Sequence, residues 1–366
     1  MLEADPRQFI RPLSREFIAW LASAPVRRVL LVLLLLVAGQ IGFAGYEAAW
    51  LHLPLVREEP PHFAAYQLFQ TVFAVAISAA LVSALVAARA HAAPFDAAAS
   101  RRRDLAVGLV SVAAAMAATI LFLVDPRGFH DFAQEDRPLE WASALLLLLA
   151  GGVIAVRAFS GRRDRFSLAI AALLCAGLFV LGMEEISWGQ RLYGFATPER
   201  LAEVNWQSEF NFHNVQTDLS ETVYYFGAGI FLVLLPLLRD VLRGSWLALP
   251  PFAFLPQRSV ALVSAPILIF NYGHWDLLPV QLSILLGFFV LLACARGAAM
   301  RGNRGEAAVW ATTAAIMLIG QLLFLALGAR MTEVPDATEY KELFIALGFA
   351  WYAWTLAPAR QPKRET

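Results

Sequence analysis

Long apolar runs recur along nearly the whole chain and constrain its fold more than any other feature. A run of roughly 17–25 apolar residues crosses the hydrocarbon core of a membrane as one helix, and the sequence contains about ten such runs. They fall at 29–50, 64–88, 105–124, 138–158, 166–186, 220–241, 257–273, 278–297, 306–329 and 340–357. The sequence therefore predicts an all-α, polytopic integral membrane helix bundle.

Composition and charge support this class. Of the 366 residues, 59% are hydrophobic and 16% are charged, whereas soluble domains carry about 25% charged residues. The formal net charge is zero, so no basic surface for nucleic acid is present. No long linker separates the apolar runs, and residues 1–366 are predicted to form a single transmembrane domain.

The basic residues predict the orientation of this bundle. Most of the 29 Lys and Arg residues fall in segments that would share one side of the membrane with both termini. Cytoplasmic segments of membrane proteins are enriched in Lys and Arg. Both termini are therefore expected in the cytoplasm, with residues 1–28 as a cytoplasmic or interfacial segment.

The opposite, outer side has a different chemistry. Every histidine except His91 falls there. The outer loop 125–140 is acidic and is a candidate docking face for a protein partner. A second outer segment, 187–217, is predicted to be an extended or re-entrant functional loop, because polar residues gather in it between two apolar runs.

The densest polar stretch runs from Glu184 to Asn214 and follows a run, Phe166 to Met183, without charged side chains. Ionisable groups at the edge of a membrane helix are costly and by default suggest function. The candidate catalytic residues, which can exchange protons or clamp an anion, are Glu184, Glu185, Arg191, His213, His274 and Asp276. The candidate substrate-binding residues, which can donate or accept hydrogen bonds, are Ser187, Trp188, Gln190, Asn205, Gln207, Glu209, Asn211 and Asn214. From Asn205 to His213 polar and other residues alternate, which predicts one polar and one aromatic face.

Two interpretations of this polar stretch remain open. Mixed histidine and carboxylate ligands suit zinc or another divalent metal, and the candidate ligands are His213, His274 and Glu185. No HExxH, CxxC or HxxxH spacing is present. The alternative is a hydrogen-bond network that pins the outer segment to the helices. A nucleophilic role for Ser187 is weaker, because no nucleophile elbow surrounds it.

The residues EEISWGQR, followed by NxQxExNxHN, resemble a signature of uncharacterised bacterial multi-span membrane proteins. The resemblance covers about thirty residues and implies no established activity, substrate or cofactor. It places the expected protein in a bacterial inner (plasma) membrane.

A polar site at headgroup depth favours an enzyme that acts on a membrane lipid or a lipid-linked substrate, as a hydrolase or transferase with or without a metal. A carrier with an outer vestibule and an accessory subunit of a membrane complex are the alternatives. Intramembrane glutamines such as Gln70 and Gln321 are interpreted as bonds between helices. Lys341 is expected in a solvated pair with Glu339 or Glu342.

Overall fold

The computed structural model describes residues 23–90, 102–134, 137–161, 163–241, 252–330 and 336–356. Within these residues every regular element is a helix, and none is a strand. The expected interfacial segment before residue 23 and the inner-side His91 lie outside the described residues. The prediction of an all-α fold is confirmed.

Eight helices in the described residues are long and apolar enough to cross a membrane. They comprise α2 (Ala24–Tyr46), α3 (Ala65–Ala90), α4 (Arg102–Val124), α6 (Pro138–Phe159), α7 (Arg165–Glu185), α10 and α11 (Thr217–Gly229 and Leu235–Val241, joined through η4, Ile230–Leu234), α14 (Leu278–Met300) and α15 (Arg304–Leu327). Their length and composition indicate a multi-pass membrane protein.

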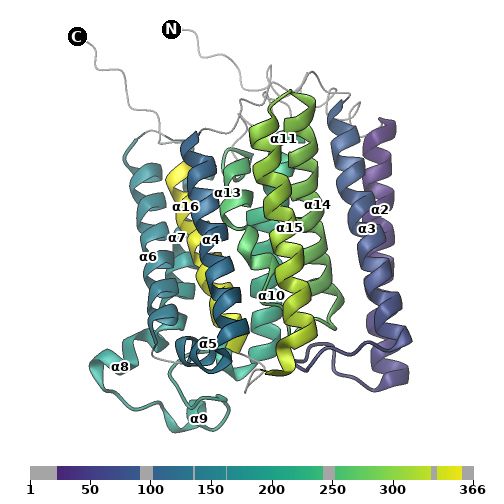
Figure 1. The fold of residues 1–366 in the computed structure, drawn as a ribbon. Helices are drawn as coiled ribbons and strands as arrows, with labels where there is room; N and C mark the ends of the chain where they lie inside the picture. The colour runs from purple at the N-terminus through teal and green to yellow at the C-terminus, as the bar shows by residue number, and fades with distance from the viewer. Residues whose placement is uncertain are drawn as a thin grey trace, which may run out of the picture.

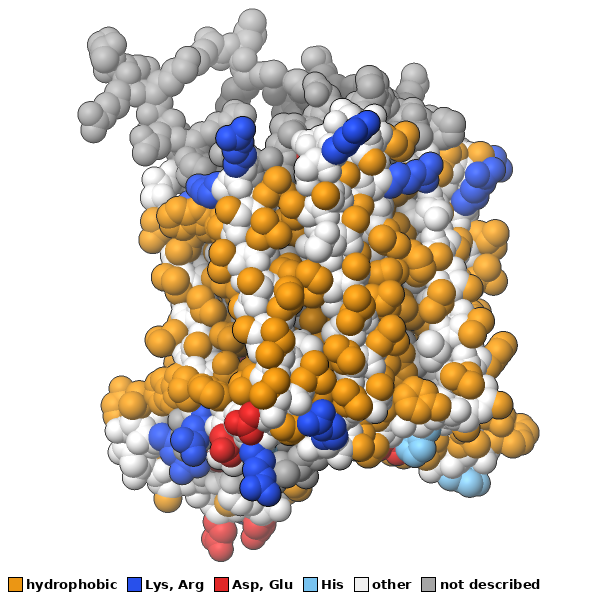
Figure 2. Space-filling view, viewed as in Figure 1, with side chains coloured by type: hydrophobic (Ala, Val, Ile, Leu, Met, Phe, Trp, Pro, Cys, Tyr) orange, Lys and Arg blue, Asp and Glu red, His pale blue; other side chains and the backbone are white. Residues whose placement is uncertain are grey.

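The helices form one bundle with chemically different ends (Figure 1). The α2–α3 pair lies at one edge, and α6 packs between α7 and α16 (Asp336–Thr355) at the other. Three short helices, α5 (Pro126–Ala133), α8 (Gln190–Tyr193) and α9 (Glu199–Ala202), lie together at one end. Figure 2 shows a broad apolar band between the ends, with Asp, Glu and His side chains together with some Lys and Arg on the end that carries the short helices, and Lys and Arg on the other.

The segment predicted as a span over 257–273 is not a continuous helix. It contains the short α13 (Arg258–Val263) and the 3-10 turn η6 (Ala265–Leu268), and then runs irregularly to Leu277. Pro266 removes an amide donor that a helix would need. Irregular backbone is tolerated at membrane depth only where protein surrounds it, and nearly every residue of this segment is buried.

Side chains from neighbouring helices satisfy the backbone of this buried segment. The Gln321 amide donates to the Asn271 carbonyl at 2.8 Å and accepts from the Asn271 backbone amide at 3.2 Å. The Ser111 hydroxyl donates to the Val263 carbonyl at 2.6 Å, and the Gln70 side chain donates to the Asp276 carbonyl at 3.0 Å. Gln70 and Gln321 therefore join different parts of the chain as predicted, but their partner is the irregular segment and not a neighbouring helix.

Candidate functional site

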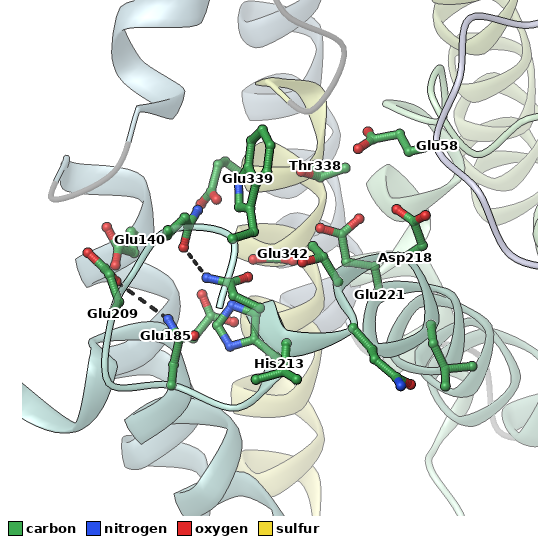
Figure 3. Close-up of a pocket in the computed structure, with 18 of the residues that line it drawn as sticks. Glu58, Glu140, Glu185, Glu209, His213, Asp218, Glu221, Thr338, Glu339 and Glu342 are labelled. Atoms are coloured by element: carbon green, nitrogen blue, oxygen red, sulfur yellow. Dashed lines mark hydrogen bonds between the residues drawn. The ribbon is translucent and has the colours of Figure 1, made fainter. Parts of the chain in front are cut away.

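A cavity of about 1120 Å³ opens at the end of the bundle that carries α5, α8 and α9. Its walls come from the loop after α2, from α5, α6 and α7, from the loop 204–217, and from α10 and α16. The carboxylates that line it are Glu58, Glu140, Glu185, Glu209, Asp218, Glu221, Glu339 and Glu342 (Figure 3). No Lys or Arg is among the described residues of its lining. We refer to this cavity as the acidic pocket.

Glu184 anchors the loop that forms one wall of the pocket. Its carboxylate accepts hydrogen bonds from the Trp188 indole at 2.6 Å and from the backbone amides of Phe212 and His213 at 2.6 and 3.0 Å. Nδ1 of His213 lies 3.3 Å from the same carboxylate. A carboxylate on Nδ1 fixes the tautomer and the orientation of an imidazole ring, so Glu184 positions His213, which lines the acidic pocket.

The chain turns sharply where α7 ends. Ser187 and Trp188 have positive φ angles of 45° and 54°, and Gly189 follows with 77°. The left-handed region is unfavourable for residues with a Cβ, and such strain persists only where the surroundings hold it. The Trp188 bond to Glu184 and a bond from the Ser187 hydroxyl to Glu209 hold this turn.

The loop 204–217 is held by its own polar side chains. The Asn205 amide donates to the Asn211 carbonyl at 2.9 Å, and its oxygen accepts from the backbone amides of Gln207 and Glu209 at 3.0 and 3.2 Å. The Asn214 side chain donates to Gln207. These bonds form a hydrogen-bond network in this part of the loop, as the alternative to a metal site predicted.

Further bonds tie the loop to α8. Gln190 accepts from the Phe210 amide at 2.7 Å and donates to the Thr197 hydroxyl at 2.8 Å. Arg191 donates to Glu209 at 2.7 Å. The Arg191 side chain is 55% exposed, and it is not among the residues that line the acidic pocket.

The predicted alternation of faces in this loop is partly confirmed. Asn205, Glu209 and Asn211 are buried, whereas Trp206 and Phe212 are 78% and 60% exposed. The backbone, however, is a series of turns and bends and not the extended segment expected from the alternation. The side-chain amide of Asn205 caps backbone amides that an extended strand would direct elsewhere.

Glu185, the next residue after Glu184, belongs to the pocket itself. Its carboxyl accepts from the Ser143 hydroxyl of α6 at 3.2 Å, and Glu342 of α16 lines the same pocket. The Tyr225 phenol of α10 donates to Glu342 at 2.7 Å. Glu185 and Glu342 are therefore two acidic groups on the wall of one cavity, and two like charges in such a site disfavour each other's ionised form.

His274 is not among the residues that line the acidic pocket, but it lies beside three carboxylates that are, Glu58, Asp218 and Glu221. Its Nε2 is 3.3 Å from Glu221, and one ring nitrogen lies within 4.8 Å of carboxylate oxygens of Glu58 and Asp218. Burial, with a smaller contribution from Lys341, lowers the pKa of His274 to about 3, so its ring is neutral at pH 7. The structure therefore groups His274 with Glu58 and Asp218. The other two predicted metal ligands, His213 and Glu185, are not in this group and line the pocket near Glu342.

Asp276 occupies a neighbouring site beside His62. Its carboxylate accepts from the His62 backbone amide at 2.9 Å and lies 2.9 Å from His62 Nδ1. Burial raises the pKa of Asp276, and the hydrogen bonds from His62 partly offset that effect. Glu59, His62 and Asp276 form a second group whose possible metal-ligand atoms lie close together. Glu59 also forms an ion pair with Arg57 at 2.5 Å. Asp276 is not among the residues that line the acidic pocket.

Several pocket residues were not among the sequence candidates. Sequence reasoning missed Glu58, Asp218, Glu221, Glu339 and Glu342, which line the pocket, and Ser143 and Tyr225, which donate hydrogen bonds to Glu185 and Glu342. The available signal was the group of charges at Glu339, Lys341 and Glu342 in an otherwise apolar run, which was interpreted as a solvated pair.

That interpretation of Lys341 is wrong. Lys341 is 3% exposed, donates to the Asn271 side chain at 2.5 Å and lies 3.8 Å from the centre of the Tyr225 ring. A buried ammonium needs such partners, because leaving water without them is costly.

The acidic loop 125–140, which the sequence analysis predicted on the outer side, contributes to the same site. It contains α5, in which Phe129 is fully buried. The Phe129 carbonyl accepts a hydrogen bond from the Tyr340 phenol at 3.0 Å. His130 and Glu140 from this segment line the acidic pocket. The segment is therefore a wall of the pocket.

Comparison with known proteins adds no relative: no family model, no curated protein and no solved structure matches this chain.

Proposed function

We propose that this chain is a bacterial inner-membrane enzyme that uses the acidic pocket to act on a lipid or a lipid-linked substrate. The observation that carries the proposal is the pair of acidic residues Glu185 and Glu342, which line one cavity at the polar end of an apolar bundle. Lipid headgroups and the bonds that join them to acyl chains lie at this depth of a membrane.

The proposed topology supports an outer position for the pocket. We count about ten crossings, which are the eight long helices, the broken segment with α13 and η6, and α16. An even number of crossings leaves both termini on one side, which the basic residues assign to the cytoplasm. The end of the bundle opposite the acidic pocket carries mostly Lys and Arg among its described charges (Figure 2), which is typical of a cytoplasmic face.

The proposed chemistry is general acid–base catalysis. One carboxyl of the Glu185–Glu342 pair donates a proton to a leaving group while the other accepts one from the attacking hydroxyl or water. His213, oriented by Glu184, supplies a second proton-exchanging group on the same pocket. The chemistry fits a hydrolase or a transferase equally, because the two differ only in the attacking group.

The lining also limits the substrate. Its carboxylates would repel a phosphate that has no counter-cation, since no Lys or Arg is among its described lining residues. The pocket therefore favours a substrate portion that presents hydroxyl, amide or amino groups, or a phosphate that is neutralised by a bound cation.

The experiment is lipid turnover by the purified chain in proteoliposomes made from a bacterial membrane lipid extract, with products followed by mass spectrometry. We expect Glu342→Gln and Glu185→Gln each to lower turnover by about 10²-fold or more, the usual contribution of a general acid or base. Glu203→Gln, at an exposed loop position, is the matched control. Equal turnover by all variants would contradict the proposal.

A carrier with an outer vestibule is the second candidate. The observation that favours it is the buried polar contact of Asn271, Gln321 and Lys341 on the irregular segment inside the bundle. A carrier would take up a cationic solute into proteoliposomes without changing it chemically, and uptake with unchanged lipid would favour this candidate over the enzyme.

A further inference from the structure

We infer that Glu58, Asp218, Glu221 and His274 form a binding site for one divalent metal ion at the side of the acidic pocket. These residues meet from three separate parts of the chain: the loop between α2 and α3, the start of α10 and the loop before α14. The inference goes beyond the proposed activity, because its test is metal binding and not turnover.

The first support is the geometry of the ligand atoms. A nitrogen of His274 and carboxylate oxygens of Glu58 and Asp218 lie within 4.8 Å of one another. A carboxylate oxygen of Glu221, one turn after Asp218 on α10, lies 3.3 Å from His274 Nε2. Two atoms that each lie about 2.0–2.2 Å from one zinc ion are at most about 4.4 Å apart, and small rotations of the carboxylate side chains would bring the whole group within that limit.

The second support is independent of the acidic residues. His274 is 3% exposed, and its Nε2 makes no hydrogen bond in the described structure although it faces these carboxylates. The nearby Glu221 oxygen also makes none. Buried polar atoms without hydrogen bonds are costly and require a specific explanation, and a cation between the ring nitrogen and the carboxylates would satisfy both atoms.

The local charge supports the same conclusion. Glu58, Asp218 and Glu221 are three acidic residues around the His274 ring. Lys341 interacts electrostatically with Glu221, but its ammonium donates to Asn271 and lies over the Tyr225 ring. A divalent cation is the ligand that a cluster of carboxylates and an imidazole attracts.

The ligand types indicate which metal would bind. One imidazole and several carboxylate oxygens suit zinc, manganese or iron(II), whereas calcium and magnesium prefer oxygen ligands alone. We take Zn²⁺ as the expected ion and Co²⁺ as its spectroscopic substitute. The neighbouring group of Glu59, His62 and Asp276 is a poorer site, because Arg57 already binds Glu59 and His62 already binds Asp276.

The test is a titration of the full chain, purified in detergent and stripped with a chelator, with Zn²⁺ by calorimetry and with Co²⁺ by visible absorption. We expect one equivalent to bind the wild-type chain. His274→Ala and Glu221→Gln should each raise Kd at least tenfold and should weaken the Co²⁺ absorption bands. His130→Ala and Glu140→Gln, which alter the lining of the same pocket outside the group, should bind as the wild type does.

Several outcomes would overturn the inference. They are no binding by the wild-type chain, equal binding by His274→Ala and Glu221→Gln, or binding that is lost in His62→Ala and kept in His274→Ala. Melting temperatures without metal show whether each variant is folded. If His274→Ala does not fold, the nearly isosteric Glu221→Gln decides the question alone.

Discussion

Glu184 and Glu185 are adjacent in the chain, but their carboxyl groups serve different parts of the site. Glu184 accepts hydrogen bonds from the Trp188 indole and from the amides of Phe212 and His213. Glu185 faces Ser143 and Glu342 across the pocket wall. The first residue builds the loop, and the second is the one that we propose for proton transfer.

Glu184→Gln should loosen the loop without removing the pocket carboxylates. The substitution replaces charge-assisted hydrogen bonds, each of which contributes about 1.5–3 kcal/mol, with weaker neutral ones. We expect faster hydrogen exchange at the Phe212 and His213 amides, with Glu203→Gln as the control. Unchanged exchange at both amides would show that Glu184 does not anchor the loop.

The Glu185–Glu342 pair should behave as a unit. If the two carboxyls share one proton-transfer task, the double variant Glu185→Gln/Glu342→Gln should lose about as much turnover as either single variant, and not the product of the two losses. Turnover in proteoliposomes measures this. Losses that multiply would indicate two independent roles.

Asn205 should contribute to stability through its side-chain amide. Asn205→Ala leaves the backbone amides of Gln207 and Glu209 and the carbonyl of Asn211 without their partner. We expect a loss of about 2–4 kcal/mol, because buried unpaired groups cost about 1–3 kcal/mol each and relax in part. Thermal unfolding in detergent checks this, with the exposed Ser208→Ala as the control; equal melting temperatures would contradict it.

Gly229 and Gly227 test the packing of α10 against α14. A Cβ at Gly229 would lie 2.9 Å from the Ser283 Cβ, whereas one at Gly227 would meet nothing within 4 Å. Gly229→Ala should therefore cost about 1–3 kcal/mol. Gly227→Ala on the same helix should be neutral or stabilise by up to about 1 kcal/mol, and a reversed order of the two melting temperatures would refute this packing.

Asp164 should give the start of α7 a dependence on pH. Its carboxylate accepts from the Ser167 hydroxyl and amide at 2.5 and 2.9 Å, and these bonds lower the pKa of Asp164 below 3.8. Since the folded-state pKa is depressed, the stabilisation is present above pH 3.8 and is lost as the pH falls through the lower, folded-state pKa.

The corresponding variant is Asp164→Ala. At pH 7 it should lose about 1 kcal/mol, the usual contribution of an N-cap. The difference in melting temperature between wild type and variant should shrink as the pH falls below 3.8. A difference that stays constant with pH would exclude the ionised carboxylate as the source.

The sequence predicts the long helices well, because an apolar run of sufficient length has one stable form in a membrane. It does not predict the irregular segment after α13, since a buried irregular run and a short spanning helix have the same apolar composition. The hydrogen bonds between Gln321 and Asn271 identify the segment as a buried irregular run and not a spanning helix, but the sequence does not reveal this contact.

The candidate site was predicted in part for a similar reason. The polar stretch at 184–214 is conspicuous in the sequence, and the structure brings Glu185 and His213 to the pocket. Glu342, which lines the pocket with Glu185, lies more than one turn inside α16 and far along the chain, and spacing gives no sign that the two residues meet. Most of the conspicuous residues, such as Asn205 and Asn211, instead stabilise the loop.

The most direct test of the proposed function is the comparison of wild type with Glu342→Gln in proteoliposomes of bacterial membrane lipid, with every lipid species followed by mass spectrometry. The account predicts that wild type consumes at least one lipid species and that Glu342→Gln consumes it about 10²-fold more slowly, while the variant keeps the wild-type melting temperature within a few degrees. An unchanged lipid profile with wild type, or equal consumption by the variant, would contradict it.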